Sequence, residues 1–253
     1  MSPPPAALLW DVDGTLAETE LLGHRRAFNR AFAEAGLPWR WDPPTYLQLL
    51  AISGGRERLR HFLTDARGQP PAEAEVEALQ ASKTCHYTAL VAAGELVLRP
   101  GVRRLMAEVA AAGLPQAIVT TSGRAAVQAL LDGQLPQHAQ WLPLWICGED
   151  VARKKPHPQA YQLALQRLGC CAATALAIED SANGVATASA AGLPVLVTRS
   201  ASSAAEPAEA FAAAAAELDG LGDAEAPVRV RRGPACPGGR VTLSYLQHLL
   251  SAR

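Results

Sequence analysis

The feature that most constrains the fold is a series of short apolar runs without the alternation of a half-exposed strand. They occupy residues 6–10, 116–120, 142–147, 175–178 and 194–197. Strands buried on both faces have this pattern, and such strands belong to parallel sheets with helices on either side. Helical patterns separate the later runs, at residues 102–112, 125–131, 158–168 and 183–191. The sequence therefore predicts an α/β fold, a Rossmann-like parallel sheet with helices on both faces.

One interval interrupts this alternation of strand and helix. Between Thr19 and Arg99 the patterns predict only helices, at residues 20–35, 44–50, 56–66 and 72–92. The interval begins directly after the first strand, and ligands of open α/β sheets bind at the carboxyl ends of the strands. We therefore expect residues 18–96 to form an all-helical cap domain over the ligand site. The catalytic core would consist of residues 1–17 and 97–253.

Composition excludes several classes of function. The chain has 253 residues, 49% of them hydrophobic, and a net charge of −1, which favours neither nucleic acid nor an anionic membrane surface as a partner. No apolar run reaches the ~20 residues of a membrane span, and the first residues lack the parts of a signal peptide. Five cysteines without metal-binding spacing suit a reducing compartment. We expect a cytoplasmic monomer, or a protein of the plastid stroma if a transit peptide has been removed.

Chemically distinctive side chains follow the first four predicted strands. In chain order they are an acidic pair, a hydroxyl cluster, two lysines and a second acidic pair: Asp11 and Asp13, Thr120 to Ser122, Lys154 and Lys155, and Glu179 and Asp180. Mg2+ takes carboxylate oxygens, commonly one or two of them together with substrate phosphate. A phosphoryl group takes hydroxyl and N–H donors and a cation. The strand ends therefore predict a site for both.

Each of these signals has a simpler explanation when taken alone. Asp-Gly is a common turn, and Thr-Thr-Ser before a helix is commonly an N-cap cluster. Glu-Asp-Ser at a helix start complements the helix dipole, and adjacent lysines are usually a solvated surface. Their ordered recurrence at successive strand ends favours a common site.

Several of these stretches resemble the four motifs of the haloacid dehalogenase-like phosphatases. They are DVDGTL at residues 11–16, Thr120, Lys155 and IEDSANG at residues 178–184. The resemblance extends over residues 6–198, and the helical insert after the first motif is similar to the cap of that superfamily. It implies a Mg2+-dependent phosphatase that works through an aspartyl-phosphate.

The resemblance also implies a role for each motif residue. Asp11 would be the nucleophile, and Asp13 would protonate the leaving oxygen and then activate the hydrolytic water. Thr120 and Lys155 would hold the phosphoryl oxygens. Dehalogenases of the superfamily lack the second aspartate, so Asp13 favours phosphoryl transfer. The expected Mg2+ ligands are Asp11, the backbone carbonyl of Asp13 and Asp180, with Glu179 beside them.

A second set of residues concerns the substrate. Residues 53–58, SGGRER, place two glycines before an arginine-bearing helix, and backbone N–H groups with guanidinium groups can bind an anion. A plain turn before a solvated helix face explains the same residues without a ligand. Together with AETE at 17–20 and GHRRAFN at 23–29, the stretch resembles the CbbY-type phosphatases. These hydrolyse xylulose 1,5-bisphosphate, an inhibitory by-product of Rubisco, to xylulose 5-phosphate.

This second resemblance implies a sugar bisphosphate as the partner and a place in the Calvin cycle. Arg56 is expected to hold the distal phosphate, where the family usually has Lys, which differs in geometry. Glu20 and Tyr46 are expected to contact the sugar, and His24 either packs at the hinge or contacts substrate. The other residues expected at the substrate are Gly54, Gly55, Arg58, Thr121, Ser122 and Lys155.

Other functions stay open. A β-phosphoglucomutase-like sugar phosphomutase would reuse the aspartyl-phosphate, but those mutases carry a cap lysine four residues before the cap arginine, where this chain has Ile52. A phosphatase for another small sugar phosphate and a non-catalytic sugar-phosphate-binding protein are further alternatives.

The C-terminal fifth of the chain carries no functional motif. The sequence predicts an alanine-rich helix at residues 206–218, a surface loop at 228–240, and a strand or helix at 241–250 that docks on the core.

Overall fold

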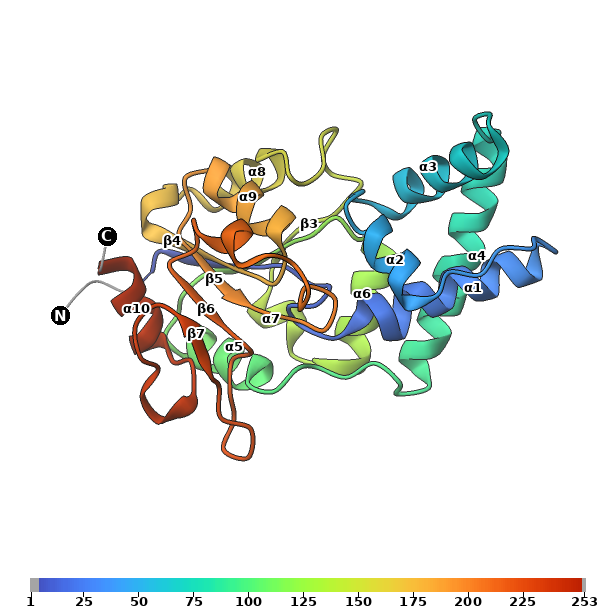
Figure 1. The fold of residues 1–253 in the computed structure, drawn as a ribbon. Coiled ribbons are helices and arrows are strands. Elements are labelled where there is room, and N and C mark those ends of the chain that lie inside the picture. The colour runs from blue at the N-terminus through green and yellow to red at the C-terminus, as the bar shows by residue number, and fades with distance from the viewer. Residues whose placement is uncertain (1–4, 252–253) are drawn as a thin grey trace.

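The computed structural model describes residues 5–251 and contains one seven-stranded sheet (Figure 1). The strand order is β3-β2-β1-β4-β5-β6-β7, and every neighbouring pair is parallel except β6 and β7. The α/β prediction is confirmed. The strands are β1 Ala7–Trp10, β2 Gln116–Val119, β3 Leu144–Ile146, β4 Ala175–Glu179, β5 Val195–Thr198, β6 Ala216–Leu218 and β7 Val230–Arg232.

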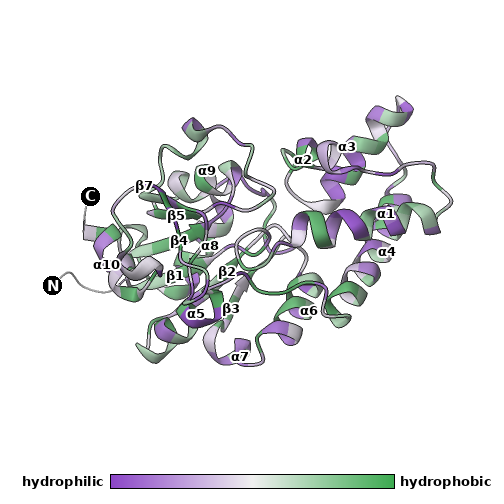
Figure 2. Cartoon of the chain, turned by 60° about the horizontal axis from the view of Figure 1, so that its bottom comes forward, coloured by the Kyte–Doolittle hydropathy of each residue, from purple (hydrophilic) through white to green (hydrophobic). Residues whose placement is uncertain are grey.

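Both faces of the sheet are buried, which explains the apolar runs. Leu8 and Trp10 of β1 join one hydrophobic cluster, together with residues of α5, α6 and α10. The alternate residues Ala7 and Leu9 join a second cluster with residues of α8 and α9. Figure 2 shows the hydrophobic colour concentrated on the strands between these helices. The helices are α5 Val102–Ala111, α6 Arg124–Gln134, α7 His138–Trp141, α8 Gln159–Leu168, α9 Ala182–Ala190 and α10 Leu243–Ser251.

The segment between β1 and β2 begins with helices that lie beyond one end of the sheet (Figure 1). They pack around their own cluster, which contains Phe28, Phe32 and Trp41. Leu98 bridges Ala17 where the chain crosses to and from these helices. The helices are a π-helical turn η1 Glu20–His24, then α1 Arg25–Glu34, α2 Pro43–Leu49, α3 Gly55–Arg67 and α4 Glu73–Ala92.

The C-terminal part differs from the sequence prediction. The helix expected at residues 206–218 is wrong: a single 3-10 turn, Ala208–Phe211, follows Pro207, and β6 comes next. Ala216 pairs with Leu196, so pairing with the edge of the sheet overrides the helix propensity of alanine. The expected loop at 228–240 contains β7, and the last segment is a helix, α10. The short helix α7 was not predicted.

The helices of residues 5–251 also bear on membrane insertion. None of them combines the length and the apolar character that crossing a membrane would require.

Candidate active site

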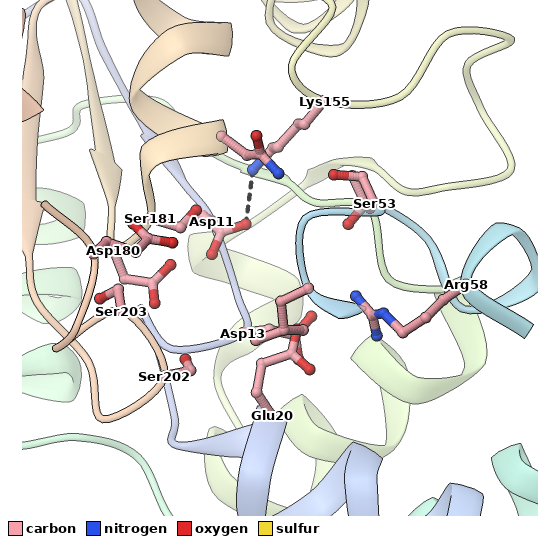
Figure 3. A pocket seen from close by; sticks show the side chains of 14 residues that line it. Asp11, Asp13, Glu20, Ser53, Arg58, Lys155, Asp180, Ser181, Ser202 and Ser203 are labelled. Atoms are coloured by element: carbon pink, nitrogen blue, oxygen red, sulfur yellow. Dashed lines mark hydrogen bonds and ion pairs between the residues drawn. The ribbon is translucent and has the colours of Figure 1, made fainter. Parts of the chain in front are cut away.

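The sheet register brings the motif residues together at the carboxyl ends of the strands. Trp10 at the end of β1 pairs with Ile118 of β2 and Ile178 of β4. The residue that follows Trp10 is Asp11, whose backbone N–H donates to the carbonyl of Ile178 at 3.0 Å. Asp11 therefore lies beside Glu179, the last residue of β4. Figure 3 shows this end of the sheet with the residues that line the pocket.

Lys155 joins two carboxylates in this buried cluster. Its Nζ donates to Oδ1 of Asp11 at 2.7 Å and to Oε1 of Glu179 at 2.6 Å. The hydroxyl of Tyr161 on α8 donates to the same Glu179 oxygen at 2.6 Å. Although burial opposes the charged form, Asp11 and Glu179 raise the pKa of Lys155 above its ordinary value. The ammonium group is therefore held in its charged form.

Negative charge exceeds positive charge in this cluster. One oxygen each of Asp11, Glu179 and Asp180 lie within 4.8 Å of one another, and all three side chains are buried. Burial, followed by the charge of Glu179, raises the pKa of Asp11 to about 7 against the opposing effect of Lys155. Burial and Asp11 likewise raise the pKa of Asp180 well above its usual range. A cation would relieve this excess.

The donor set fits Mg2+. Carboxylate oxygens are the ligands that this hard cation takes. Oε2 of Glu179 is buried without a hydrogen-bond partner in residues 5–251, while Oδ2 of Asp180 accepts from the hydroxyl of Ser200 at 2.5 Å. A side chain at Gly14 would meet this Asp180 oxygen at 2.1 Å, so only glycine leaves room for the carboxylate. The part played by the Asp13 carbonyl stays a prediction.

Asp13 lies in a separate network that reaches into the inserted helices. Its Oδ1 accepts from the hydroxyl of Thr19 at 2.5 Å and contacts Nε2 of His24 at 2.7 Å. Its Oδ2 accepts from the hydroxyl of Ser122. Burial opposes ionisation, but His24 and the two hydroxyls hold the pKa of Asp13 well below its usual range. The orientation of Asp13 thus depends on residues of the inserted segment and on Ser122 of the core.

His24 is held from its other side by a lysine that the sequence analysis missed. Lys83 Nζ lies 2.8 Å from His24 Nδ1, and the imidazole stacks on Tyr87 at 4.4 Å between ring centroids. Burial lowers the pKa of Lys83 to about 8. Lys83 stands four residues after Leu79 and four before Tyr87, on the apolar face of α4. A charged residue on that face was the signal that could have identified it.

Glu20, Tyr46 and Arg58 form a hydrogen-bonded trio within the inserted helices. Tyr46 donates its hydroxyl hydrogen to Glu20 at 2.6 Å and accepts from Arg58 Nη1 at 3.0 Å. Arg58 also donates to the carbonyls of Leu49 and Ile52, which fixes its direction. Arg58 and Glu20 line the same pocket as Asp11 and Asp13 (Figure 3). Tyr46 is fully buried behind them.

Arg56 does not line this pocket. It lines a different cavity, between α3, α4 and the loop after β3, which Gly55 also lines. Residues two apart on a helix point roughly 200° apart, so Arg56 and Arg58 cannot face the same ligand. A side chain at Gly54 would meet the ion pair between Lys154 Nζ and Glu57 Oε2, which are 2.7 Å apart. Arg56 therefore does not line the pocket that contains Asp11, and its place at the distal phosphate stays a prediction.

The remaining hydroxyl residues take different positions. Thr121 lines the pocket, whereas the buried Thr120 accepts from the Ser122 backbone N–H at 3.1 Å. The sequence analysis missed the pocket wall contributed by α9 and the loop after β5. The sequence pattern that could have identified this wall is the one seen after the other strands, polar residues that follow an apolar run. The missed residues are Ser181, Asn183, Ser202, Ser203 and Glu206.

Comparisons with known proteins show the family of this chain. The family model for haloacid dehalogenase-like hydrolases matches residues 5–192. A CbbY protein of Cupriavidus necator is 47% identical over 230 residues, which cover 88% of each chain. A phosphoglycolate phosphatase of Rhodospirillum rubrum is 32% identical over 196 residues, covering 76% of this chain and 79% of that protein.

The structure of this chain is also similar to a solved structure. CbbY from Rhodobacter sphaeroides, a mutant crystallised with xylulose 1,5-bisphosphate, superposes with a TM-score of 0.80 at 40% sequence identity. The match covers 86% of this chain and 96% of that one. The chain therefore belongs to the haloacid dehalogenase-like hydrolase family, as a phosphatase of the CbbY type.

Proposed function

We propose that this phosphatase hydrolyses xylulose 1,5-bisphosphate to xylulose 5-phosphate, with Mg2+ and an aspartyl-phosphate intermediate. The observation that carries the proposal is one pocket with a basic group at each end. Lys155 lies at one end beside Asp11, and the guanidinium of Arg58 lies at the other, on the cap side (Figure 3). Two separated cations suit a small sugar that carries two phosphates. The complex of the similar CbbY with xylulose 1,5-bisphosphate supports this choice.

The residues of the core supply the covalent chemistry. A carboxylate oxygen of Asp11 attacks phosphorus, and the bond between phosphorus and the sugar oxygen breaks. Asp13, whose neighbours favour its ionised form, must first take up a proton, which it then gives to the departing oxygen. Asp13 later removes a proton from the water that attacks the aspartyl-phosphate, and this restores its protonated form. Asp11 and inorganic phosphate are then released. Lys155 balances charge on Asp11 throughout. Mg2+, held by Asp11, Asp180 and the Asp13 carbonyl, would neutralise the remaining negative charge.

Substrate entry requires the inserted helices to move. The free volume of the pocket is about 70 Å³, well below the roughly 300–1,000 Å³ of typical small-molecule sites. Residues 18–96 would act as a cap that opens at the two crossings near Ala17 and Leu98. On closure, Thr19 and His24 would bring Asp13 into position, so that proton transfer is possible only after bulk water has been excluded.

The test is a phosphate-release assay with Mg2+ on three substrates. Xylulose 1,5-bisphosphate should give a kcat/KM at least about tenfold above those of xylulose 5-phosphate and 2-phosphoglycolate, since only it uses the interactions of Arg58. Asp11→Asn should show no turnover, because an amide cannot form the acyl-phosphate. A preference for 2-phosphoglycolate would contradict the substrate, and turnover by Asp11→Asn would contradict the mechanism.

A further inference from the structure

Arg99 stands where the chain returns from the inserted helices to the core. Its backbone N–H donates to the carbonyl of Leu16 at 2.7 Å, which ties the two crossings together. Its side chain is only 10% exposed and extends to the carboxyl end of the sheet. None of the motifs considered above accounts for this arginine.

The two terminal nitrogens of the Arg99 guanidinium bond to four backbone carbonyls, and Nε lies within ion-pair distance of a carboxylate. Nη1 donates to the carbonyls of Gly14 and Thr198, the latter at 2.8 Å. Nη2 donates to the carbonyls of Arg199 at 2.6 Å and Asp219 at 3.0 Å. Nε lies 3.3 Å from Oε1 of Glu18, at the start of the inserted helices. Arginine has five N–H donors in a fixed plane, and no other side chain could satisfy this set.

Two of these carbonyls flank the carboxylate cluster. Gly14 directly follows Asp13, and its α-carbon lies against Oδ2 of Asp180. Arg199 directly precedes Ser200, whose hydroxyl donates to the same Asp180 oxygen. Asp180 is therefore held between the loop after β1 and the loop after β5. Arg99 bonds to the backbone of both loops.

We propose that Arg99 is a positioning residue for the cation site. It holds the two loops at the spacing that the Asp180 carboxylate and the Asp13 carbonyl need to bind one ion, and it ties this spacing to the cap through Glu18. The inference rests on the Mg2+ site of the proposed function. Arg99 itself touches neither the cation nor the substrate.

Lysine is the informative substitution, because it keeps the charge but has three donors on a single atom. The single nitrogen of Arg99→Lys can replace at most one of the two Nη groups, so the carbonyls of Arg199 and Asp219 that Nη2 holds lose their donor if the lysine takes the place of Nη1. The loop after β5 is then held less firmly against the loop after β1. Mg2+ binding, measured by isothermal titration calorimetry on the whole protein, should weaken on the order of tenfold, the lower end of the effect of residues that orient metal ligands. Arg103→Lys is the matched control, since within residues 5–251 the exposed Arg103 donates only to the carbonyl of Gln134.

A double-mutant cycle separates this role from general destabilisation. Ser200→Ala removes the hydroxyl that orients Asp180 on one of the loops held by Arg99. If Arg99 acts through that loop, the losses of Mg2+ affinity in Arg99→Lys and Ser200→Ala should combine to less than their sum. Fully additive losses of Mg2+ affinity would contradict the proposal. This holds even if Arg99→Lys is less stable than the wild type.

The outcomes distinguish this inference from the proposed function. Equal Mg2+ dissociation constants for the wild type and Arg99→Lys would overturn the inference alone, even if the melting temperature falls. A wild type that binds no Mg2+ would overturn the Mg2+ site of the proposed function and this inference with it.

Discussion

The carboxylates of this site are tolerated because each has a defined neighbour. Asp11 and Glu179 share Lys155, Asp180 accepts from Ser200, and Asp13 has three donors of its own. The difference between Asp11 and Asp13 follows from these neighbours. Asp13 is surrounded by donors that favour its ionised form, whereas Asp11 lies among other carboxylates. Two aspartates separated by one residue therefore have opposite pKa shifts, upward for Asp11 and downward for Asp13. These shifts by themselves disfavour a charged nucleophile and a protonated acid, so the proposed roles require a cation beside Asp11 and a proton delivered to Asp13 before the sugar oxygen departs.

Arg58 allows a direct test of the substrate at the residue scale. Arg58→Ala loses a charge-assisted contact worth ~1.5–3 kcal/mol, or roughly ten- to a hundredfold in kcat/KM for the bisphosphate. Hydrolysis of a sugar monophosphate should change much less, because it lacks the distal phosphate. The measurement is kcat/KM for both substrates. The ratio of the bisphosphate value to the monophosphate value should fall in Arg58→Ala.

Arg56→Ala is the matched control for this experiment. It lies two residues away on the same helix but lines the other cavity, so the substrate ratio should equal that of the wild type. A loss of bisphosphate preference in Arg56→Ala but not in Arg58→Ala would show that the sequence hypothesis was right and our assignment wrong.

At the scale of elements, two of the contacts that join the inserted helices to the core differ in their burial. The turn η1 brings His24 to Asp13, and α3 brings Glu57 to Lys154 in the loop after β3. The first contact is buried, whereas the side chains of the second are 20% and 40% exposed. The second pair is therefore screened by water and contributes little to stability. If the inserted helices move as proposed, this pair forms only in the closed state.

Glu57→Gln should shift the equilibrium towards the open cap. Because a partly exposed ion pair contributes up to about 1 kcal/mol, the KM for the bisphosphate should rise roughly two- to fivefold at low ionic strength. The effect should shrink as NaCl is added, since salt screens the pair. Glu73→Gln breaks the Arg60–Glu73 pair, which lies wholly within the inserted helices, and should leave KM unchanged. An identical salt dependence in both variants would exclude this role for Glu57.

For the whole molecule, the carboxylate cluster makes the stability of the metal-free protein depend on pH. The pKa of Asp11 is about 7 in the folded protein and roughly 4 in an unfolded chain. The folded state therefore binds this proton more tightly. The stabilisation is complete below about pH 4 and is lost as the pH rises through about 7. Asp180 acts in the same direction, and Mg2+ removes the effect by replacing the protons.

Unfolding by urea in the presence of a chelator should show this dependence. Between pH 5 and pH 7.5 the free energy of unfolding should fall as the pH rises. Asp11→Asn cannot ionise, so its stability should fall less over this range. At pH 7.5, added Mg2+ should raise the free energy of unfolding of the wild type back towards its value at pH 5. The same addition should raise the free energy of unfolding of Asp11→Asn by less. A stability that rises with pH in the chelated wild type would contradict the charge balance described here.

The core and the main parts of the site were predictable because their signals are local. Apolar runs without alternation identified five parallel strands, and the order of polar residues after them predicted the meeting of Asp11, Lys155, Glu179 and Asp180. Parallel strands end at the same edge of a sheet, so spacing along the chain was enough to bring residues more than 100 positions apart together.

The rest was decided by tertiary contacts that leave no periodic trace. Alanine-rich residues before Leu218 became β6 because β5 offered an unpaired edge, and their own propensity favoured a helix. Arg58 rather than Arg56 faces the pocket because the rotation of α3 is set by packing of Leu59 and Leu63 into the cap core. Lys83 contacts His24, which is 59 residues away in the chain, and Arg99 donates to Gly14, which is 85 residues away. The sequence by itself determined the sheet and its catalytic edge, whereas packing between distant segments determined which cations face that edge.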